Sequence, residues 1–423
     1  MAAIENGRNV SRIARLIYGG VMMLCIGLNL GWSIFREPLT EIFPEWTATR
    51  ISVTFTIAMI VLCIGGFVSG KLSTRISYRA ILRIAATCIL AGFVLVTLLL
   101  DPKEEARSLL VLYICYGGLF GFGVGFTFVS IPSSVIRWFP DRAGLSTGLL
   151  MFGYGMGGMA LGSVVNAFAK SIGIINTFAA VGAIIAVVIF VLSLSIRVPS
   201  SAELAMIAAN SRATVTTSSR SKIPEHDFSI TQVFRSSAFW LLFFWGATAA
   251  AAGMTVINSA ANIAGYFGAP ALLGLISSVF FSLGCLLFGY FFDRLGSRRA
   301  MLLNAAFLLI GGVSLVLGAV AFNIAFVIVG ISCVGFGFGG NPGMMPSATM
   351  RLFGDKNFNI NFGAVTFCCL PAALIGPLVS SGLQEAAGGS YLPAFIMVII
   401  ISALNLVTVF GLSNVSKKRG LEN

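Results

Sequence analysis

Stretches of about 20 apolar residues recur along the whole chain, and this repetition constrains the fold more than any other feature. Each stretch is long enough to cross the hydrocarbon core of a bilayer as a helix. Inside lipid the backbone must satisfy its own hydrogen bonds, so these segments are expected to be helical. We predict an all-α membrane protein with twelve transmembrane helices, near 16–35, 51–70, 80–100, 109–131, 144–169, 173–195, 237–264, 271–292, 300–320, 323–341, 360–383 and 391–412.

The composition excludes a water-soluble globular protein. Of 423 residues, 57% are hydrophobic and 10% are charged, whereas soluble domains carry about 25% charged residues. The net charge of +12 is spread among short connectors, which argues against a nucleic-acid partner. The eight cysteines lie in apolar stretches without a Cys-x-x-Cys pair, and the one histidine, His226, lies in a polar segment. We therefore expect no disulfide framework, metal site or cofactor.

The longest polar connector divides the chain into two halves of six spans. Between 196 and 236 the composition changes to Ser, Thr, Arg and other charged residues. We expect an N-terminal six-helix bundle at 1–195, a cytoplasmic linker at 196–236 and a C-terminal six-helix bundle at 237–423.

The positive charges predict the orientation, because cytoplasmic connectors carry an excess of Lys and Arg. If both termini and the even-numbered connectors are cytoplasmic, five of the 27 basic residues fall on the other side: Arg36, Arg50, Lys103, Arg107 and Lys170. The basic start precedes an apolar run that is too long for a signal peptide. We expect a multi-pass protein of a cell membrane, with a prokaryotic inner membrane favoured.

The second half of the chain repeats motifs of the first half. The segment 121–142 has Gly121, Gly125, Pro132, Arg137 and Asp141, and equivalent residues recur 214 positions later at Gly335, Gly339, Pro346, Arg351 and Asp355. Two parallel six-span repeats are an architecture of secondary transporters.

The connector after the eighth span resembles a motif of a known protein family. Its residues Gly289, Asp293, Arg294, Gly296 and Arg298 resemble the signature cytoplasmic motif of the major facilitator superfamily, and 70–79 is a weaker copy. Within that superfamily, the segments 31–35, 137–148 and 153–155 resemble the oxalate/formate antiporter and monocarboxylate transporter group.

Charged residues of these connectors are the candidates for gating. The resemblance implies that Asp293 meets a helix N-terminus or an arginine and holds the two halves together until access alternates. The alternative is that such charges only fix the orientation in the membrane. The gating candidates are Arg75, Asp141, Arg142, Asp293, Arg294, Arg298 and Asp355.

The expected spans contain no ionisable residue away from their ends, although charged substrates usually call for one. In the group that the chain resembles, basic residues in spans eight and eleven pair with the carboxylate substrate. The corresponding positions are Cys285 and Cys369, which are neutral. These neutral positions argue against binding of a dianion such as oxalate.

Neutral polar residues remain as candidates for substrate binding. Asn29 and Trp32, and likewise Asn258 and Asn262, share a helix face. The alternative for each is an interhelical hydrogen bond or a ring at the membrane interface. The full set is Asn29, Trp32, Tyr116, Tyr154, Trp245, Asn258, Asn262, Cys285 and Cys369.

The sequence favours a transporter that moves a small organic solute, with a monocarboxylate suggested by the resemblance. A carrier of neutral or amphiphilic solutes, such as drugs, and a non-transporting membrane receptor are the alternatives. No nucleotide-binding loop of the Gly-x-x-x-x-Gly-Lys-Ser type is present, so an enzyme is not expected. The expected partners are the solute and the lipid bilayer, and the chain is expected to be a monomer.

Overall fold

The structure is a computed structural model that describes residues 2–140, 142–200, 203, 227–257, 259–270 and 275–418. These residues form helices and connectors without a β-strand. Eleven helices of the described part are long and apolar enough to cross a membrane, and a shorter apolar segment, Phe358–Leu374, accompanies them. The predicted all-α membrane fold is confirmed.

The outward surface of the helices is apolar. Leu98 and Val320 are each 71% exposed and Val187 is 60% exposed. Soluble monomers rarely expose contiguous apolar surface of this kind, so these side chains are suited to contact with lipid.

The described chain divides into two compact units. The N-terminal unit comprises Met1–Phe139 and Gly153–Ile207, and the C-terminal unit comprises Pro140–Phe152 and Ala208–Asn423. The division falls within a single helix, α7 (Ala143–Ile172), whose first turns pack with the C-terminal unit. The predicted domain limits at 195 and 237 follow the polar connector instead, and 204–226 of that connector lie outside the described residues.

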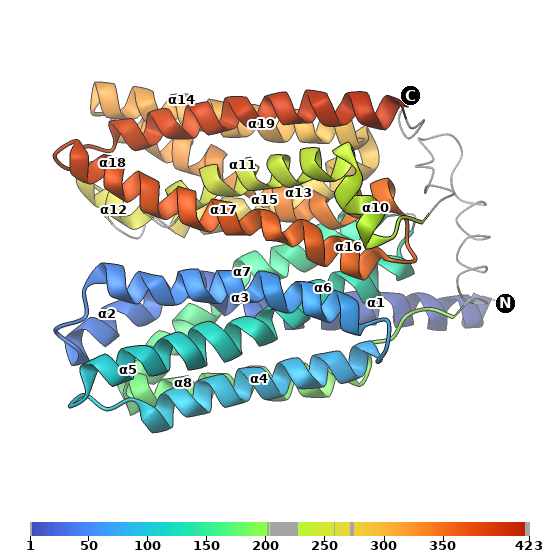
Figure 1. The fold of residues 1–423 in the computed structure, drawn as a ribbon, viewed down its shortest axis with the longest axis horizontal. Coiled ribbons are helices and arrows are strands. Elements are labelled where there is room, and N and C mark those ends of the chain that lie inside the picture. Colours follow the sequence, from blue (N-terminus) through green and yellow to red (C-terminus); the bar gives the residue numbers. More distant parts are fainter. Residues whose placement is uncertain are drawn as a thin grey trace. The chain divides into compact units, whose positions relative to one another are not determined.

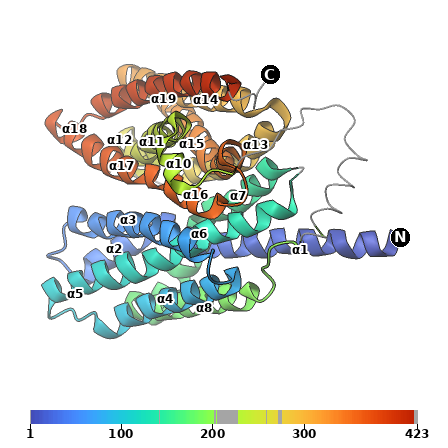
Figure 2. The same ribbon diagram turned by 45° about the vertical axis from the view of Figure 1, so that its right-hand side comes forward.

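In the N-terminal unit, α3 packs on α6 and α4 packs on α8, and the latter pair lies side by side in both views (Figures 1 and 2). Thr47 precedes α3 and Ser77 precedes α4 as N-cap residues, and their hydroxyls each accept a hydrogen bond from a first-turn amide. The helices of this unit are α1 (Ala2–Ile26), α2 (Ser33–Ile42), α3 (Ala48–Leu72), α4 (Tyr78–Leu99), α5 (Glu105–Val111), α6 (Gly121–Val135) and α8 (Ile174–Ser193).

Two of the N-terminal spans change their helical type along their length. A 3-10 turn, Gly27–Gly31, separates α1 from α2, and a π-helical stretch, Leu112–Phe120, separates α5 from α6. A Cβ on Gly27 would overlap the backbone of Tyr154 in α7, so glycine is needed where these helices cross. The π-helical stretch matters because such stretches are frequent at functional sites.

In the C-terminal unit, α14 packs on both α15 and α19, and α11 contacts α19. The helices of this unit are α10 (Ile230–Arg235), α11 (Ser237–Ile257), α12 (Ala260–Tyr266), α13 (Leu275–Leu295), α14 (Ser297–Ala321), α15 (Ile324–Phe353), α16 (Phe358–Val365), α17 (Cys369–Leu374), α18 (Ser380–Ala386) and α19 (Leu392–Lys418).

Three predicted spans of this unit differ from the structure, and the one expected at 237–264 ends as α11 at Ile257, before α12. The span expected at 323–341 continues through Pro342 and Pro346 to Phe353, because neighbouring groups in a membrane helix can satisfy the carbonyls that a proline frees. The span expected at 360–383 is broken into α16, α17 and α18 by a 3-10 turn, Thr366–Cys368, and a π-helical stretch, Ile375–Val379.

Candidate functional site

The interior of the described chain is polar in places but uncharged. Apart from aromatic and cysteine side chains, its buried polar residues are Ser, Thr and Asn, and no buried Asp, Glu, Lys, Arg or His occurs among the described residues. This agrees with the prediction that ionisable residues are confined to connectors and span ends.

The N-terminal unit contains buried polar atoms that have no hydrogen-bond partner, and three of them lie in its apolar spans on fully buried residues. They are the Tyr116 hydroxyl, Asn29 Oδ1 and Thr54 Oγ1, on residues that are all 0% exposed. An unsatisfied buried group costs about 1–3 kcal/mol, and native structures contain few of them. Such atoms are therefore the candidates for hydrogen bonds with the polar groups of a bound solute.

Aromatic rings pack around the Tyr116 ring. The Tyr116 ring centroid lies 4.4 Å from that of Trp32 and 4.7 Å from that of Phe120. The π-helical stretch Leu112–Phe120 carries Tyr116, and a Cβ on the adjacent Gly117 would lie 2.8 Å from the Ile57 side chain. The helix therefore approaches α3 closely at this point.

The predicted candidates of this unit are partly brought together. Trp32 contacts Tyr116, and its Nε1 donates a hydrogen bond to the Ile51 carbonyl at 3.1 Å. Asn29 Nδ2 donates to Met59 Sδ at 3.4 Å, which leaves Oδ1 as its unsatisfied atom. The Tyr154 ring packs on Phe128, with 5.1 Å between centroids.

The C-terminal unit has its own unsatisfied donor at Trp245 in α11. The Trp245 side chain is 0% exposed and its Nε1 has no partner. The backbone around it is held in place, because Asn405 Nδ2 of α19 donates to the Trp245 carbonyl at 2.8 Å and Asn341 Nδ2 of α15 donates to the Gly246 carbonyl at 2.7 Å. Since indole nitrogen only donates, the free Nε1 requires an acceptor.

Sequence reasoning missed Thr54, Asn341 and Asn405. The available signal was a polar residue within an apolar span, which applies to all three. Which of these side chains form hydrogen bonds depends on how distant spans are aligned against one another in the fold. A single sequence does not reveal this alignment.

The remaining substrate-binding candidates of the C-terminal unit are Asn258, Asn262, Cys285 and Cys369. Asn258 is outside the described residues, and Asn262 is exposed on α12. Cys285 is fully buried where α13 meets α15, and a Cβ on Gly343 would overlap its carbonyl. Cys369 is half-buried at the start of α17, where its thiol is hydrogen-bonded to that of Cys368.

Asp293 of α13 contacts the N-terminus of α7. Its Oδ1 accepts a hydrogen bond from the Gly144 amide at 2.9 Å, and its Oδ2 accepts one from the Leu145 amide at 2.8 Å. The first amides of a helix have no acceptor within the helix and carry the positive end of its dipole. Both carboxylate oxygens are thus used in charge-assisted hydrogen bonds.

Close packing allows this contact. A Cβ on Gly144 would lie 2.8 Å from Asp293 Oδ1 and would overlap the Gly289 carbonyl. One turn further, the Thr147 hydroxyl lies 3.0 Å from the Gly343 carbonyl and 3.1 Å from the Ser347 hydroxyl. The glycines of the motif therefore bring α7, α13 and α15 within hydrogen-bonding range.

The other gating candidates are surface charges of varied exposure. Arg75, Arg142 and Arg294 are exposed, and the Arg294 guanidinium lies 5.7 Å from the Tyr290 ring centroid. Arg298 and Asp355 are half-buried, and both make further polar interactions. Asp141 lies outside the described residues.

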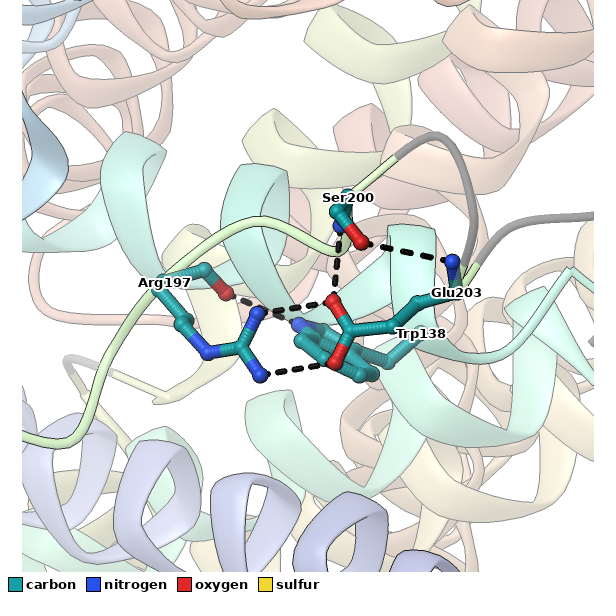
Figure 3. A network of polar contacts seen from close by, with 4 residues as sticks. All are labelled: Trp138, Arg197, Ser200 and Glu203. Atoms are coloured by element: carbon teal, nitrogen blue, oxygen red, sulfur yellow. Dashed lines mark hydrogen bonds and ion pairs between the residues drawn. The ribbon is translucent and has the colours of Figure 1, made fainter.

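A second polar network lies at the start of the long connector (Figure 3). Trp138 Nε1 donates to the Arg197 carbonyl at 2.8 Å, and the Arg15 guanidinium lies 4.0 Å from the Trp138 ring centroid. Arg197 also forms a two-pronged ion pair with Glu203, with both N···O distances 2.7 Å. These contacts fasten the first residues of the connector to the N-terminal unit.

The electrostatics of this network are set by Arg197. Its hydrogen bonds lower the pKa of Glu203 to about 2, and the Ser200 amide, which donates to Glu203 Oε2 at 2.8 Å, acts in the same direction. Glu203 is therefore ionised at neutral pH. Sequence reasoning counted Arg197 only as one of the connector charges, because the ring and the acid that meet it are brought together by folding.

Eleven helices of membrane-spanning length among the described residues define a multi-pass membrane protein. The sequence profile of the Major Facilitator Superfamily matches residues 10–377. The chain belongs to this superfamily and is a membrane transporter of small solutes, which confirms the family resemblance seen in the sequence.

Two curated proteins are similar to the chain at the sequence level. One is YhjX of Escherichia coli (strain K12), described as an uncharacterized MFS-type transporter, with 25% identity over 355 residues, 82% of this chain and 81% of the relative. The other is the oxalate:formate antiporter of Oxalobacter formigenes, with 24% identity over 396 residues, 90% of this chain and 87% of the relative.

Solved structures support the fold. The proton:xylose symporter XylE bound to 6-bromo-6-deoxy-D-glucose superposes with a TM-score of 0.73 at 14% identity over 96% of each chain. FucP in the outward conformation superposes with a TM-score of 0.61 at 13% identity, over 95% of this chain and 99% of that chain. These similarities establish the shared architecture.

Proposed function

We propose that the chain transports a small monocarboxylate by alternating access, in exchange for another small anion. The observation that carries this proposal is the pair of buried hydrogen-bond donors without partners, the Tyr116 hydroxyl and Trp245 Nε1, in an interior without buried charge. Each is a group that a carboxylate oxygen would accept from.

The absence of buried cations among the described residues bears on the charge of the solute. A dianion moved into such an interior would lose its hydration without a compensating positive charge. A monoanion carries half of that charge and can be held by neutral donors. The similarity to an oxalate:formate antiporter supports a carboxylate substrate. The neutral Cys285 and Cys369 favour a carboxylate with a single negative charge over a dianion.

Carriage of neutral or amphiphilic solutes is the second candidate. The aromatic surroundings of Tyr116 and the uncharged interior favour it. Trp245 Nε1 is a donor only and would then bind a carbonyl or hydroxyl oxygen of the solute.

For the gating part, we propose that the contact of Asp293 with the first turn of α7 is made and broken during the transport cycle. Its partners are backbone amides, so the contact needs no second charged side chain. We further propose that the protein acts as a monomer in a bacterial inner membrane with cytoplasmic termini.

A thermal-shift panel on detergent-purified protein tests the substrate class, because a ligand stabilises the state that binds it. Formate and lactate are expected to raise the melting temperature, and oxalate and an uncharged sugar are not. Stabilisation by neutral solutes alone would contradict the proposal.

Two variants with matched controls test the donors. Tyr116→Phe removes only the hydroxyl, and a lost hydrogen bond to a charged group costs about 1.5–3 kcal/mol, or roughly 10- to 100-fold in affinity. Tyr113→Phe is the control, because the Tyr113 hydroxyl already donates to the Arg50 carbonyl. Trp245→Phe is likewise compared with Trp240→Phe, whose Nε1 donates to the Phe234 carbonyl. Equal affinity in each variant and its control would refute the role of the donors.

A further inference from the structure

Guanidinium groups from two helices and the long connector gather around Trp138 at one end of the N-terminal unit. The Arg15 guanidinium of α1 lies 4.0 Å from the Trp138 ring centroid, and that of Arg197 lies 5.1 Å from it. Arg12 Nε donates to the Trp138 carbonyl at 2.8 Å. Arg79 Nε of α4 donates at 3.2 Å to the carbonyl of the residue before Arg197. Four positive charges are therefore held near one buried ring.

This cluster lies where four apolar spans begin or end. The spans Arg12–Gly31 and Tyr78–Leu99 begin here, and the spans Glu105–Trp138 and Ile174–Ser193 end here. Residues at the ends of membrane spans lie at the interface between the hydrocarbon core and water. The arginines are therefore placed at the level of the lipid headgroups.

Apolar surface continues from the cluster along the outside of the unit. Ile13 and Ile17 are exposed on α1, and Val191 and Leu194 are exposed at the end of α8. Helices α1 and α8 pack on one another. A ligand at this place meets positive charge and apolar surface together. A phospholipid matches both, because its phosphate is joined to hydrocarbon chains.

The Glu203 carboxylate shows how an anion is bound in the cluster (Figure 3). Its two oxygens accept hydrogen bonds from Arg197 Nη1 and Nη2, each at 2.7 Å, and the Ser200 amide donates to one of them at 2.8 Å. A guanidinium binds two oxygens of a phosphate in the same two-pronged way. The Arg197 and Glu203 side chains are 42% and 33% exposed, so another anion can reach the guanidinium.

The balance of charge favours an anionic lipid over a zwitterionic one. Glu203 contributes one negative charge, whereas Arg12, Arg15, Arg79 and Arg197 contribute four positive charges. Like charges held close together repel one another, and an added anion reduces that repulsion. A zwitterionic headgroup brings its own cation into the cluster and loses part of this gain.

We infer that Arg15, Arg79 and Arg197 bind the phosphate of an anionic phospholipid, which competes with Glu203 for the Arg197 guanidinium. Basic residues at the membrane surface attract anionic headgroups in this way. When the phosphate takes the place of the carboxylate, the ion pair that fastens the start of the connector opens. The inference does not depend on which solute the protein transports.

Native mass spectrometry of the detergent-purified full-length protein tests the site, because it resolves each bound lipid. Phosphatidylglycerol is the anionic probe and phosphatidylcholine is the zwitterionic one. Each basic residue near an anionic lipid contributes roughly fivefold in affinity. The double variant Arg79→Gln, Arg197→Gln should therefore bind the first phosphatidylglycerol roughly 30-fold more weakly than the unaltered protein, with little change for phosphatidylcholine.

The double variant Arg50→Gln, Arg107→Gln is the matched control. Both of these arginines are exposed, and Arg107 lies at the opposite end of the span that Trp138 ends. The control removes the same charge as the first variant and should bind phosphatidylglycerol as the unaltered protein does.

The variant Glu203→Gln should have the opposite effect. It removes the competing carboxylate and keeps every arginine, so phosphatidylglycerol should bind roughly fivefold more tightly. Inorganic phosphate in excess should not displace the lipid, because it has no apolar part. Equal binding by the two double variants, weaker binding by Glu203→Gln, or displacement by inorganic phosphate would overturn the inference.

Discussion

Removal of the Asp293 carboxylate should expose two particular amides of α7. Gly144 and Leu145 donate to Asp293, whereas the next amide, Ser146, donates to the Arg142 carbonyl at 3.0 Å. Since the first amides of a helix have no acceptor within it, protection of Gly144 and Leu145 from hydrogen exchange depends on Asp293. The variant Asp293→Ala tests this dependence.

The size of the effect follows from the two hydrogen bonds. A hydrogen bond to a charged group contributes about 1.5–3 kcal/mol, and each 1.4 kcal/mol is tenfold in an equilibrium constant. Each of the two amides should therefore exchange at least roughly tenfold faster in Asp293→Ala, since protection reports the free energy of local opening.

Hydrogen exchange followed by mass spectrometry on peptides spanning 140–152 measures this directly. Asp101→Ala is the matched control, because Asp101 is an exposed acid that accepts from the Lys103 amide in another connector. Equal exchange of the Gly144 and Leu145 amides in Asp293→Ala and the unaltered protein would refute the reasoning.

Two further perturbations test packing and electrostatics in the N-terminal unit. Gly125→Ala should lower the melting temperature, because its Cβ would overlap the Leu62 carbonyl and overpacking costs about 1–3 kcal/mol, whereas Gly20→Ala, with nothing within 4 Å of its Cβ, should leave the melting temperature unchanged or raise it. An equal effect of the two variants would contradict the packing account. The folded-state pKa of Glu203, about 2, lies below its ordinary value of 4.5, so its contribution to stability is present above pH 4.5 and is lost as the pH falls toward 2. The melting temperature of Glu203→Gln should accordingly lie below that of the unaltered protein at neutral pH and converge with it near pH 2, and parallel pH profiles would argue against the ion pair.

Much of the fold could be predicted because membrane crossing imposes a length and a composition on each helix. The apolar runs and the repeated motifs therefore indicated the architecture correctly. Pro371 and Pro377 indicate a kink in the span expected at 360–383, and that span is broken, but the apolar pattern does not show the π-helical stretch Leu112–Phe120. Pro342 and Pro346 lie inside α15, yet the span with Pro371 and Pro377 is broken. Packing around each proline decides between these outcomes.

The candidate site was predicted unevenly for a similar reason. Tyr116 and Trp245 stand out as polar groups in apolar spans, and the structure leaves a donor of each unsatisfied. Asn405 is equally conspicuous in the sequence, but one of its roles is to hold the Trp245 carbonyl. The meeting of Arg15 with Trp138 joins residues on different helices. Partners brought together by tertiary packing are not visible in local spacing.

The most direct measurement of the central claim is counterflow in proteoliposomes that contain the protein. The vesicles are loaded with unlabelled formate, and labelled solutes are added outside. The uncharged interior predicts rapid exchange of formate or lactate, little exchange of oxalate, and a loss of roughly 10- to 100-fold in apparent affinity for Tyr116→Phe but not for Tyr113→Phe. Efficient exchange of oxalate, or equal behaviour of the two tyrosine variants, would contradict the account.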